Sequence, residues 1–180
     1  MTTDRLLEVR HSDDILREWQ RTPIEDFLLY HNLGADQRDY ERAELLICAC
    51  MDFRVSFNIP DKFAYVIRTP GANLIDNQFG LVAALTLADV RAVALVAHTD
   101  CAMTKVKDSE ERIVSGLIAS GWDKNTAQKF FNERVDSHAL TNPTDFVIRQ
   151  CQTLRKQYTN VIFAPLVYNV ADGKLWQVEE

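Results

Sequence analysis

Short, almost wholly apolar runs alternate with amphipathic stretches along the middle of the chain. Residues 45–50, 63–67 and 92–97 form three such runs, with the length and composition of strands buried on both faces of a parallel sheet. Residues 78–89, between the second run and the third, have the length and composition of a crossover helix. Strand, helix and strand in this order predict a right-handed βαβ unit.

The first forty residues have a helical pattern. Ser12 is a suitable N-cap for a helix whose apolar side includes Trp19. Residues 22–25 combine a capping threonine, a proline at the first helical position and a glutamate three residues after the cap. They predict a second helix that ends near Gly34, before a charged connection over residues 36–42.

The second half of the chain is helical and then returns to strand. Residues 108–158 are helical in pattern, with a helix start at Asn142, and residues 161–170 predict a fourth strand that Pro165 interrupts. Asp172-Gly173 is a two-residue turn signal leading into residues 175–178, which predicts a C-terminal β-hairpin.

These elements predict an α/β fold with a single domain. A central, mostly parallel β-sheet is flanked by helices, with an N-terminal helical arm and a C-terminal β-hairpin. Within residues 1–180, we expect the arm to cover residues 1–42 and the α/β core to cover residues 43–180. We find no internal repeat, low-complexity segment or linker in the sequence.

Composition and charge narrow the class of protein. Of 180 residues, 47% are hydrophobic and 26% are charged, and the formal net charge is -6. An acidic chain of this kind is not expected to bind nucleic acid or an anionic membrane, since phosphate binding needs a basic face. The apolar runs are too short to span a bilayer, and the polar residues 1–5 lack the apolar core of a signal peptide. A cytoplasmic protein is therefore expected.

Three residues at predicted strand ends have the side chains of a metal site. Cys50 closes the first apolar run, and His98 and Cys101 follow the third. Because ligands bind beyond the carboxyl ends of parallel strands, these side chains are expected at one edge of the sheet. Two thiolates and an imidazole suit Zn²⁺, and three protein ligands leave a fourth position open, as in catalytic zinc sites.

Two polar residues follow the first of these ligands closely. In an extended chain Cys50, Asp52 and Arg54 lie on one side, so the Asp52 carboxylate can accept a hydrogen bond from a metal-bound water while Arg54 keeps it ionised. Four cysteines are too few for a disulfide scaffold, and Cys48 and Cys151 are expected to pack in the core. The remaining histidines are expected to be solvated at the surface: His11, His31 and His138.

Cys50-Met51-Asp52-Phe53-Arg54, followed by His98-Thr99-Asp100-Cys101, resembles the β-class carbonic anhydrases. Residues 68–73 occupy the place of a family loop, and residues 168–175 resemble the family's C-terminal strand and turn. The resemblance implies one Zn²⁺ per chain, held by Cys50, His98 and Cys101, with Asp52 and Arg54 as the catalytic dyad. It further implies reversible hydration of carbon dioxide to bicarbonate by a zinc-bound hydroxide. It also implies homo-oligomers, dimers or multiples of dimers, that exchange their N-terminal helices.

The sequence departs from the family pattern around the pocket. Phe53 stands where serine is common, and Thr69-Pro70 replaces Asn-Ala. Phe53, Phe57 and Pro70 could narrow or dry the pocket mouth. The candidate pocket residues are Phe53 and Gly71. Two alternatives to carbon dioxide hydration stay open: hydrolysis of carbonyl sulfide or carbon disulfide at the same zinc site, and a zinc-binding homologue without turnover.

A zinc deaminase is a weaker alternative, and a dinucleotide-binding protein is not supported, because the motifs of both are missing. A zinc deaminase would need Pro-Cys-x-x-Cys and His-x-Glu, and the chain contains neither. A dinucleotide-binding protein would need a Gly-x-Gly-x-x-Gly loop, which Gly71 and Gly80 do not form.

Overall fold

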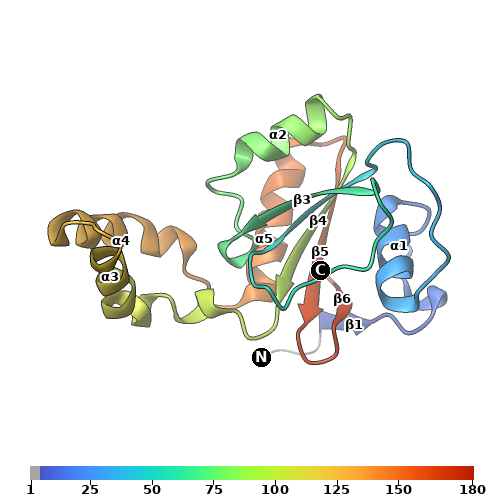
Figure 1. Ribbon diagram of the computed structural model, residues 1–180. Helices are drawn as coiled ribbons and strands as arrows, with labels where there is room; N and C mark the ends of the chain where they lie inside the picture. The colour runs from blue at the N-terminus through green and yellow to red at the C-terminus, as the bar shows by residue number, and fades with distance from the viewer. Residues whose placement is uncertain (1–4) are drawn as a thin grey trace.

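A six-stranded sheet with helices on both faces forms the body of the chain (Figure 1). The structure is a computed structural model that describes residues 5–180. The strands are β1 (Leu6–Glu8), β2 (Leu45–Cys50), β3 (Ala64–Thr69), β4 (Ala92–His98), β5 (Ile162–Asn169) and β6 (Lys174–Val178). The α-helices are α1 (Pro23–Leu28), α2 (Gln78–Thr86), α3 (Glu110–Ala119), α4 (Lys124–His138) and α5 (Pro143–Gln157). Residues 1–4, part of the polar start from which the sequence predicts no signal peptide, lie outside the described residues.

The sheet has the strand order β1-β6-β5-β4-β2-β3. Strands β3, β2, β4 and β5 run parallel, whereas β6 pairs antiparallel with β5, and β1 pairs antiparallel with β6. The predicted α/β fold, its parallel sheet and its C-terminal hairpin are therefore confirmed. Asn142 caps α5 as predicted, since its side-chain oxygen accepts from the backbone N–H groups of Thr144 and Asp145.

Alternate residues of the central strands enter two separate hydrophobic cores. In β2, Leu45 and Ile47 pack on the face covered by the N-terminal segment, together with Ile24 and Phe27. Leu46 and Cys48 pack on the opposite face, which α2 and α5 cover (Figure 1). Because both faces are covered, β2 and β4 are apolar at nearly every position, and this is the pattern visible in the sequence. Cys48 and Cys151 lie in the second core, as predicted.

The helix predicted after Ser12 does not form. A single 3-10 turn, Ser12–Asp14, is followed by an extended residue, Ile15. The buried side chain of Gln177 forms hydrogen bonds with two backbone groups that a helix would pair internally. It accepts from the Leu16 N–H and donates to the Asp14 carbonyl. A tertiary contact from β6 thus replaces the local hydrogen bonds of the predicted helix.

The second predicted helix is short. α1 begins at Pro23 after the Thr22 cap, and the chain then widens into a π-helical turn, Leu29–Leu33. It ends at Gly34, which adopts the left-handed conformation with φ of 64°. The N-terminal segment contributes buried side chains to the chain's own core. The role of residues 1–42 in dimer formation stays a prediction.

Strands at the two edges of the sheet differ from expectation. β1 was not predicted, because three residues are too few to show a periodic pattern. β3 was predicted to be buried on both faces, yet Tyr65 and Val66 are exposed because β3 is the edge strand beyond β2. No helix among residues 5–180 has both the length and the hydrophobicity required to cross a bilayer.

His31, predicted to be solvated, is half-buried between the N-terminal segment and the C-terminal hairpin. Its Nε2 lies 2.9 Å from the Gly173 carbonyl oxygen, which can only accept, so Nε2 carries the proton. Its Nδ1 accepts from the Asn58 backbone N–H at 3.1 Å. The neutral imidazole satisfies both bonds, and a second proton on Nδ1 would break one of them. Burial is the main cause that lowers the pKa of His31 below the ordinary 6.5.

This arrangement predicts a loss of folding stability in mild acid. Because the pKa of His31 is lower in the folded protein, the unfolded chain takes up the proton at a higher pH. The contribution of neutral His31 to the free energy of unfolding is therefore complete above about pH 6.5, and it declines as the pH falls toward the lowered pKa of His31. We expect His31→Gln to reduce the difference in unfolding free energy between pH 7.5 and 5.5, measured by urea denaturation at about those two pH values. His11→Gln, at an exposed position, is the control and should leave that difference unchanged. Equal pH dependence in His31→Gln and the wild type would contradict the assignment.

Candidate metal centre and active site

The parallel sheet brings the three predicted ligands to one edge. β2 and β4 are neighbours and run in the same direction, so their carboxyl ends, Cys50 and His98, lie side by side. The turn after β4 returns Cys101 to the same place. The ligand atoms of Cys50, His98 and Cys101 all lie within 4.8 Å of one another, and all three residues are buried. The structure therefore brings together the residues that the sequence predicted as ligands.

His98 has the hydrogen bonding of a metal ligand. Its Nδ1 lies 2.9 Å from the Thr99 carbonyl oxygen and must donate to it, which leaves a lone pair on Nε2. That Nε2 atom is buried and has no hydrogen-bond partner. A buried, unpartnered nitrogen facing two thiols is costly unless an ion completes it, and histidine ligands are commonly fixed through the other ring nitrogen in this way.

The thiol groups of Cys50 and Cys101 are also suited to bind a cation. A hydrogen bond from the Cys101 thiol is the main cause that lowers the pKa of Cys50 to about 4, and the backbone N–H groups of Asp52 and Gly71 act in the same direction. The pKa of Cys101 is raised, chiefly because its proton is held in that bond to Cys50. The pair of sulfur atoms therefore favours a negative charge, as a soft or borderline cation requires. One imidazole and two sulfur ligands fit Zn²⁺.

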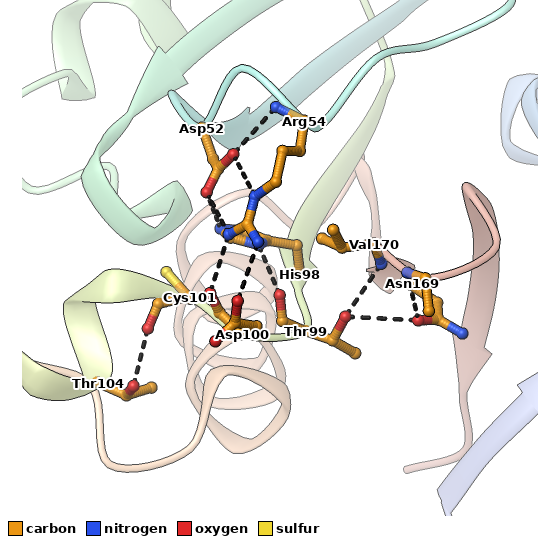
Figure 2. Close-up of polar contacts among 10 residues, drawn as sticks. Asp52, Arg54, His98, Thr99, Asp100, Cys101, Thr104, Asn169 and Val170 are labelled. Atoms are coloured by element: carbon orange, nitrogen blue, oxygen red, sulfur yellow. Dashed lines mark hydrogen bonds and ion pairs between the residues drawn. The ribbon is translucent and has the colours of Figure 1, made fainter.

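Asp52 lies beside the cluster and is held by Arg54 (Figure 2). The Arg54 Nε and Nη2 donate to the two carboxylate oxygens of Asp52 at 3.0 and 2.7 Å, and the Arg54 backbone N–H donates to Oδ1 at 3.0 Å. The other face of the carboxylate is turned toward the ligands, since Asp52 Oδ2 lies 4.0 Å from His98 Nε2. Hydrogen bonds from Arg54 are the main cause that holds the pKa of Asp52 well below its usual range. Asp52 is therefore an ionised hydrogen-bond acceptor next to the cluster.

Gly71 contributes backbone to the site and does not line the pocket. It belongs to the short 3-10 turn after β3, Pro70–Ala72, and has φ of 65°. A Cβ at this position would lie 2.8 Å from Leu140 Cδ1, so a larger residue would strain the turn and push on its neighbour. Its N–H group is thereby kept within reach of the Cys50 thiolate.

The predicted narrowing of the pocket by phenylalanines is not present. Phe53 is 93% exposed and lies outside the cavity lining. Phe57 packs edge-on against Phe27, in the core on the other face of the sheet. Only Pro70, of the three residues expected at the mouth, lines the cavity. The side chain at position 53 turns outward because the chain is already in a turn after β2, where strand alternation no longer applies.

A cavity of about 450 Å³ extends from the cluster toward α3 and α4, which stand out to one side of the sheet (Figure 1). Cys50, Asp52 and Cys101 line its inner end. The rest of its lining is mostly apolar and includes Met103, Val106, Ile113, Phe131 and Val135. Such a lining favours a small, uncharged molecule over a charged one.

Three polar residues of the cavity were not assigned to it from the sequence. Asp76 accepts from Arg134 Nη1 and pairs with His138 Nε2, both at 3.1 Å. His138 is therefore half-buried and paired, contrary to the prediction that it is solvated at the surface. No local pattern indicates this cluster, since Asp76 and α4 are far apart along the chain and meet only in the folded protein.

The fold is similar to that of solved carbonic anhydrases. A crystal structure of β-carbonic anhydrase isoform I from Trichomonas vaginalis has a TM-score of 0.64 and 17% identity, over 89% of this chain and 96% of that one. Carbonic anhydrase from Glaciozyma antarctica has a TM-score of 0.61 and 20% identity, over 92% and 100%. A carbon disulfide hydrolase in its apo form has a TM-score of 0.58 and 20% identity, over 87% of each chain.

Sequence comparison adds no closer relative, since neither a protein-family model nor a curated protein matches this chain. The structural similarity shows that the chain has the β-carbonic anhydrase fold. At identities of 20% or less, it shows the fold alone. The activity has to be argued from the site.

Proposed function

We propose that this chain catalyses the reversible hydration of carbon dioxide to bicarbonate, with one Zn²⁺ held by Cys50, His98 and Cys101. The observation that carries the proposal is the position of Asp52, an ionised carboxylate 4.0 Å from the buried, unpartnered His98 Nε2. A purely structural zinc site has no need of an ionised acceptor beside an open ligand position.

Zinc in this site would act as a Lewis acid that lowers the pKa of a water molecule at the open position. The Asp52 carboxylate would accept a hydrogen bond from a water molecule beside the cluster and so hold it at the cavity, which Asp52 lines. Arg54 keeps Asp52 ionised and fixes the plane of its carboxylate through two side-chain hydrogen bonds. The apolar lining of the cavity would hold carbon dioxide, a small neutral molecule, next to this water.

Stopped-flow measurement of carbon dioxide hydration tests the proposal, on protein of known zinc content and from about pH 6.5 to 9. We expect activity that rises with pH, as the water to be activated loses its proton more readily. One zinc per chain without hydration at any pH would exclude carbonic anhydrase activity.

A second candidate function is the hydrolysis of carbonyl sulfide or carbon disulfide. The observation that favours it is the cavity, whose apolar lining and volume of about 450 Å³ would accept a neutral molecule larger than carbon dioxide. A protein of the same fold is described as a carbon disulfide hydrolase. Release of hydrogen sulfide from carbon disulfide or carbonyl sulfide, without carbon dioxide hydration, would favour this function. Inactivity toward all three substrates would leave a zinc-binding homologue without turnover.

The proposal also includes the cellular location and the oligomeric state of the enzyme. We expect a cytoplasmic homo-oligomer, a dimer or a multiple of dimers, with residues 1–42 at the contact between copies. Light scattering after size exclusion measures the oligomeric state. A monomer at micromolar concentration would contradict this part of the proposal and leave the catalytic part unchanged.

A further inference from the structure

Arg54 joins the chain segment that follows β2 to the segment that follows β4 (Figure 2). On one side its guanidinium binds Asp52, in the loop after β2. On the other side Nη1 donates to Asp100 Oδ2 at 2.9 Å, and Nη2 donates to the Asp100 backbone carbonyl at 3.1 Å. Asp100 lies between the predicted ligands His98 and Cys101. Its contact with Arg54 therefore connects this part of the chain to Asp52, which follows the third predicted ligand, Cys50.

The backbone of Asp100 is in an unusual conformation that makes these contacts. Its φ is 57°, in the left-handed region, which aspartate and asparagine adopt more readily than other residues with a side chain. In this conformation the carboxylate and the carbonyl of one residue both accept from the same guanidinium. The hydrogen bonds to Arg54 hold this conformation and join the segments that follow β2 and β4.

Asp52, Arg54 and Asp100 differ in their exposure and in whether they line the cavity. Asp52 lines the cavity, whereas Arg54 and Asp100 do not. The Asp52 side chain is 15% exposed, that of Arg54 is 33% exposed and that of Asp100 is 77% exposed. Charge alone does not explain Asp100, because a second carboxylate competes with Asp52 for Arg54. What Asp100 adds is two further fixed acceptors, which stop the guanidinium from rotating.

We propose that Asp100 is a positioning residue, which anchors Arg54 from the loop between His98 and Cys101 and thereby fixes the orientation of Asp52 at the metal centre. The inference rests on the proposed function for its effect on turnover. Without the Asp100 carboxylate, Arg54 keeps its charge and its pairing with Asp52, but the pair can turn together relative to the ligands. The expected loss is therefore one of orientation, with the zinc ligands unchanged.

Two substitutions separate the side chain from the backbone. Asp100→Gly removes the carboxylate and accepts φ of 57° without strain, so the fold is expected to remain. Asp100→Asn keeps an acceptor oxygen and is also tolerated in the left-handed region. We expect Asp100→Gly to lower kcat/KM for carbon dioxide hydration about tenfold at unchanged zinc content, and Asp100→Asn to stay within about threefold of the wild type.

A double-mutant cycle shows whether Asp100 acts through Asp52. In an Asp52→Asn background, Asp100→Gly should cause no further loss, because there is no longer an ionised carboxylate to orient. An equal loss in both backgrounds would overturn the proposal, as would full activity or loss of zinc in Asp100→Gly.

A measurement that does not depend on catalysis tests the role of Asp100 independently of the proposed function. The visible spectrum of the cobalt-substituted protein reports the surroundings of the metal. We expect Asp100→Gly to change the pH dependence of that spectrum and Asp100→Asn to leave it near the wild type. If the wild type hydrates no carbon dioxide, the proposed function fails, while the spectra still decide the role of Asp100. Identical spectra for wild type and Asp100→Gly would overturn it.

Discussion

Replacing Cys101 by alanine is expected to reduce the zinc content from about one per chain to nearly none, and to abolish carbon dioxide hydration. Cys101 is buried within 4.8 Å of the other two ligand atoms, so two ligands remain after the substitution. Two ligands bind zinc far more weakly than three, and the activity depends on the metal. Metal analysis of the purified variant by mass spectrometry measures the first effect, and stopped-flow hydration the second.

Cys48→Ala is the matched control for this experiment. Cys48 lies on β2, two residues before Cys50, and is fully buried in the core under α2 and α5. Burial alone raises the pKa of its thiol, so it stays protonated and is not a ligand. We expect this variant to keep its zinc and to lose only about 1 kcal/mol of stability. Equal zinc loss in both variants would show that disturbed packing, and not ligation, is responsible.

Removal of the metal should have the same consequence in the wild type. A chelator is expected to lower the thermal midpoint as well as the activity, since a metal that binds only the folded state stabilises it. Added zinc should restore both. Full activity after complete removal of zinc would contradict the proposed metal centre.

Asp52→Asn is expected to lower carbon dioxide hydration about 100-fold or more with zinc still bound. Asparagine has nearly the same shape, but it is neutral and cannot replace an ionised acceptor oriented by Arg54. Asp52 is ionised throughout the assay range because Arg54 holds its pKa well below the usual value. The rise of wild-type activity with pH is therefore expected to report the water that is activated, and not the titration of Asp52.

An exposed aspartate in the same connection between β2 and β3 serves as the control for charge. Asp61→Asn removes the same charge from an exposed position and should leave activity unchanged. Zinc content is measured for each variant, so that loss of metal is not mistaken for loss of catalysis. Activity near the wild-type level in zinc-loaded Asp52→Asn would remove Asp52 from the mechanism, and with it the observation that carries the proposed function.

The core of the fold and the candidate metal ligands could be predicted from local sequence patterns. Strands buried on both faces appear as continuous apolar runs, so β2 and β4 were visible without a structure. Their carboxyl ends carry Cys50 and His98, and parallel strands must place those ends at one edge. The cluster of Cys50, His98 and Cys101 therefore followed from local pattern and strand direction alone.

Features that depend on contacts between distant segments could not be predicted from local patterns. Gln177 forms hydrogen bonds with backbone groups that the helix expected after Ser12 would need, and no property of residues 12–19 reveals this. Phe53 points outward because the chain turns after β2, and the cavity wall comes from α3 and α4 instead. The contact of Arg54 with Asp100 joins residues 46 positions apart. Local patterns record the burial of a residue on its own strand or helix, whereas the partner of a polar side chain is fixed only when the whole chain has folded.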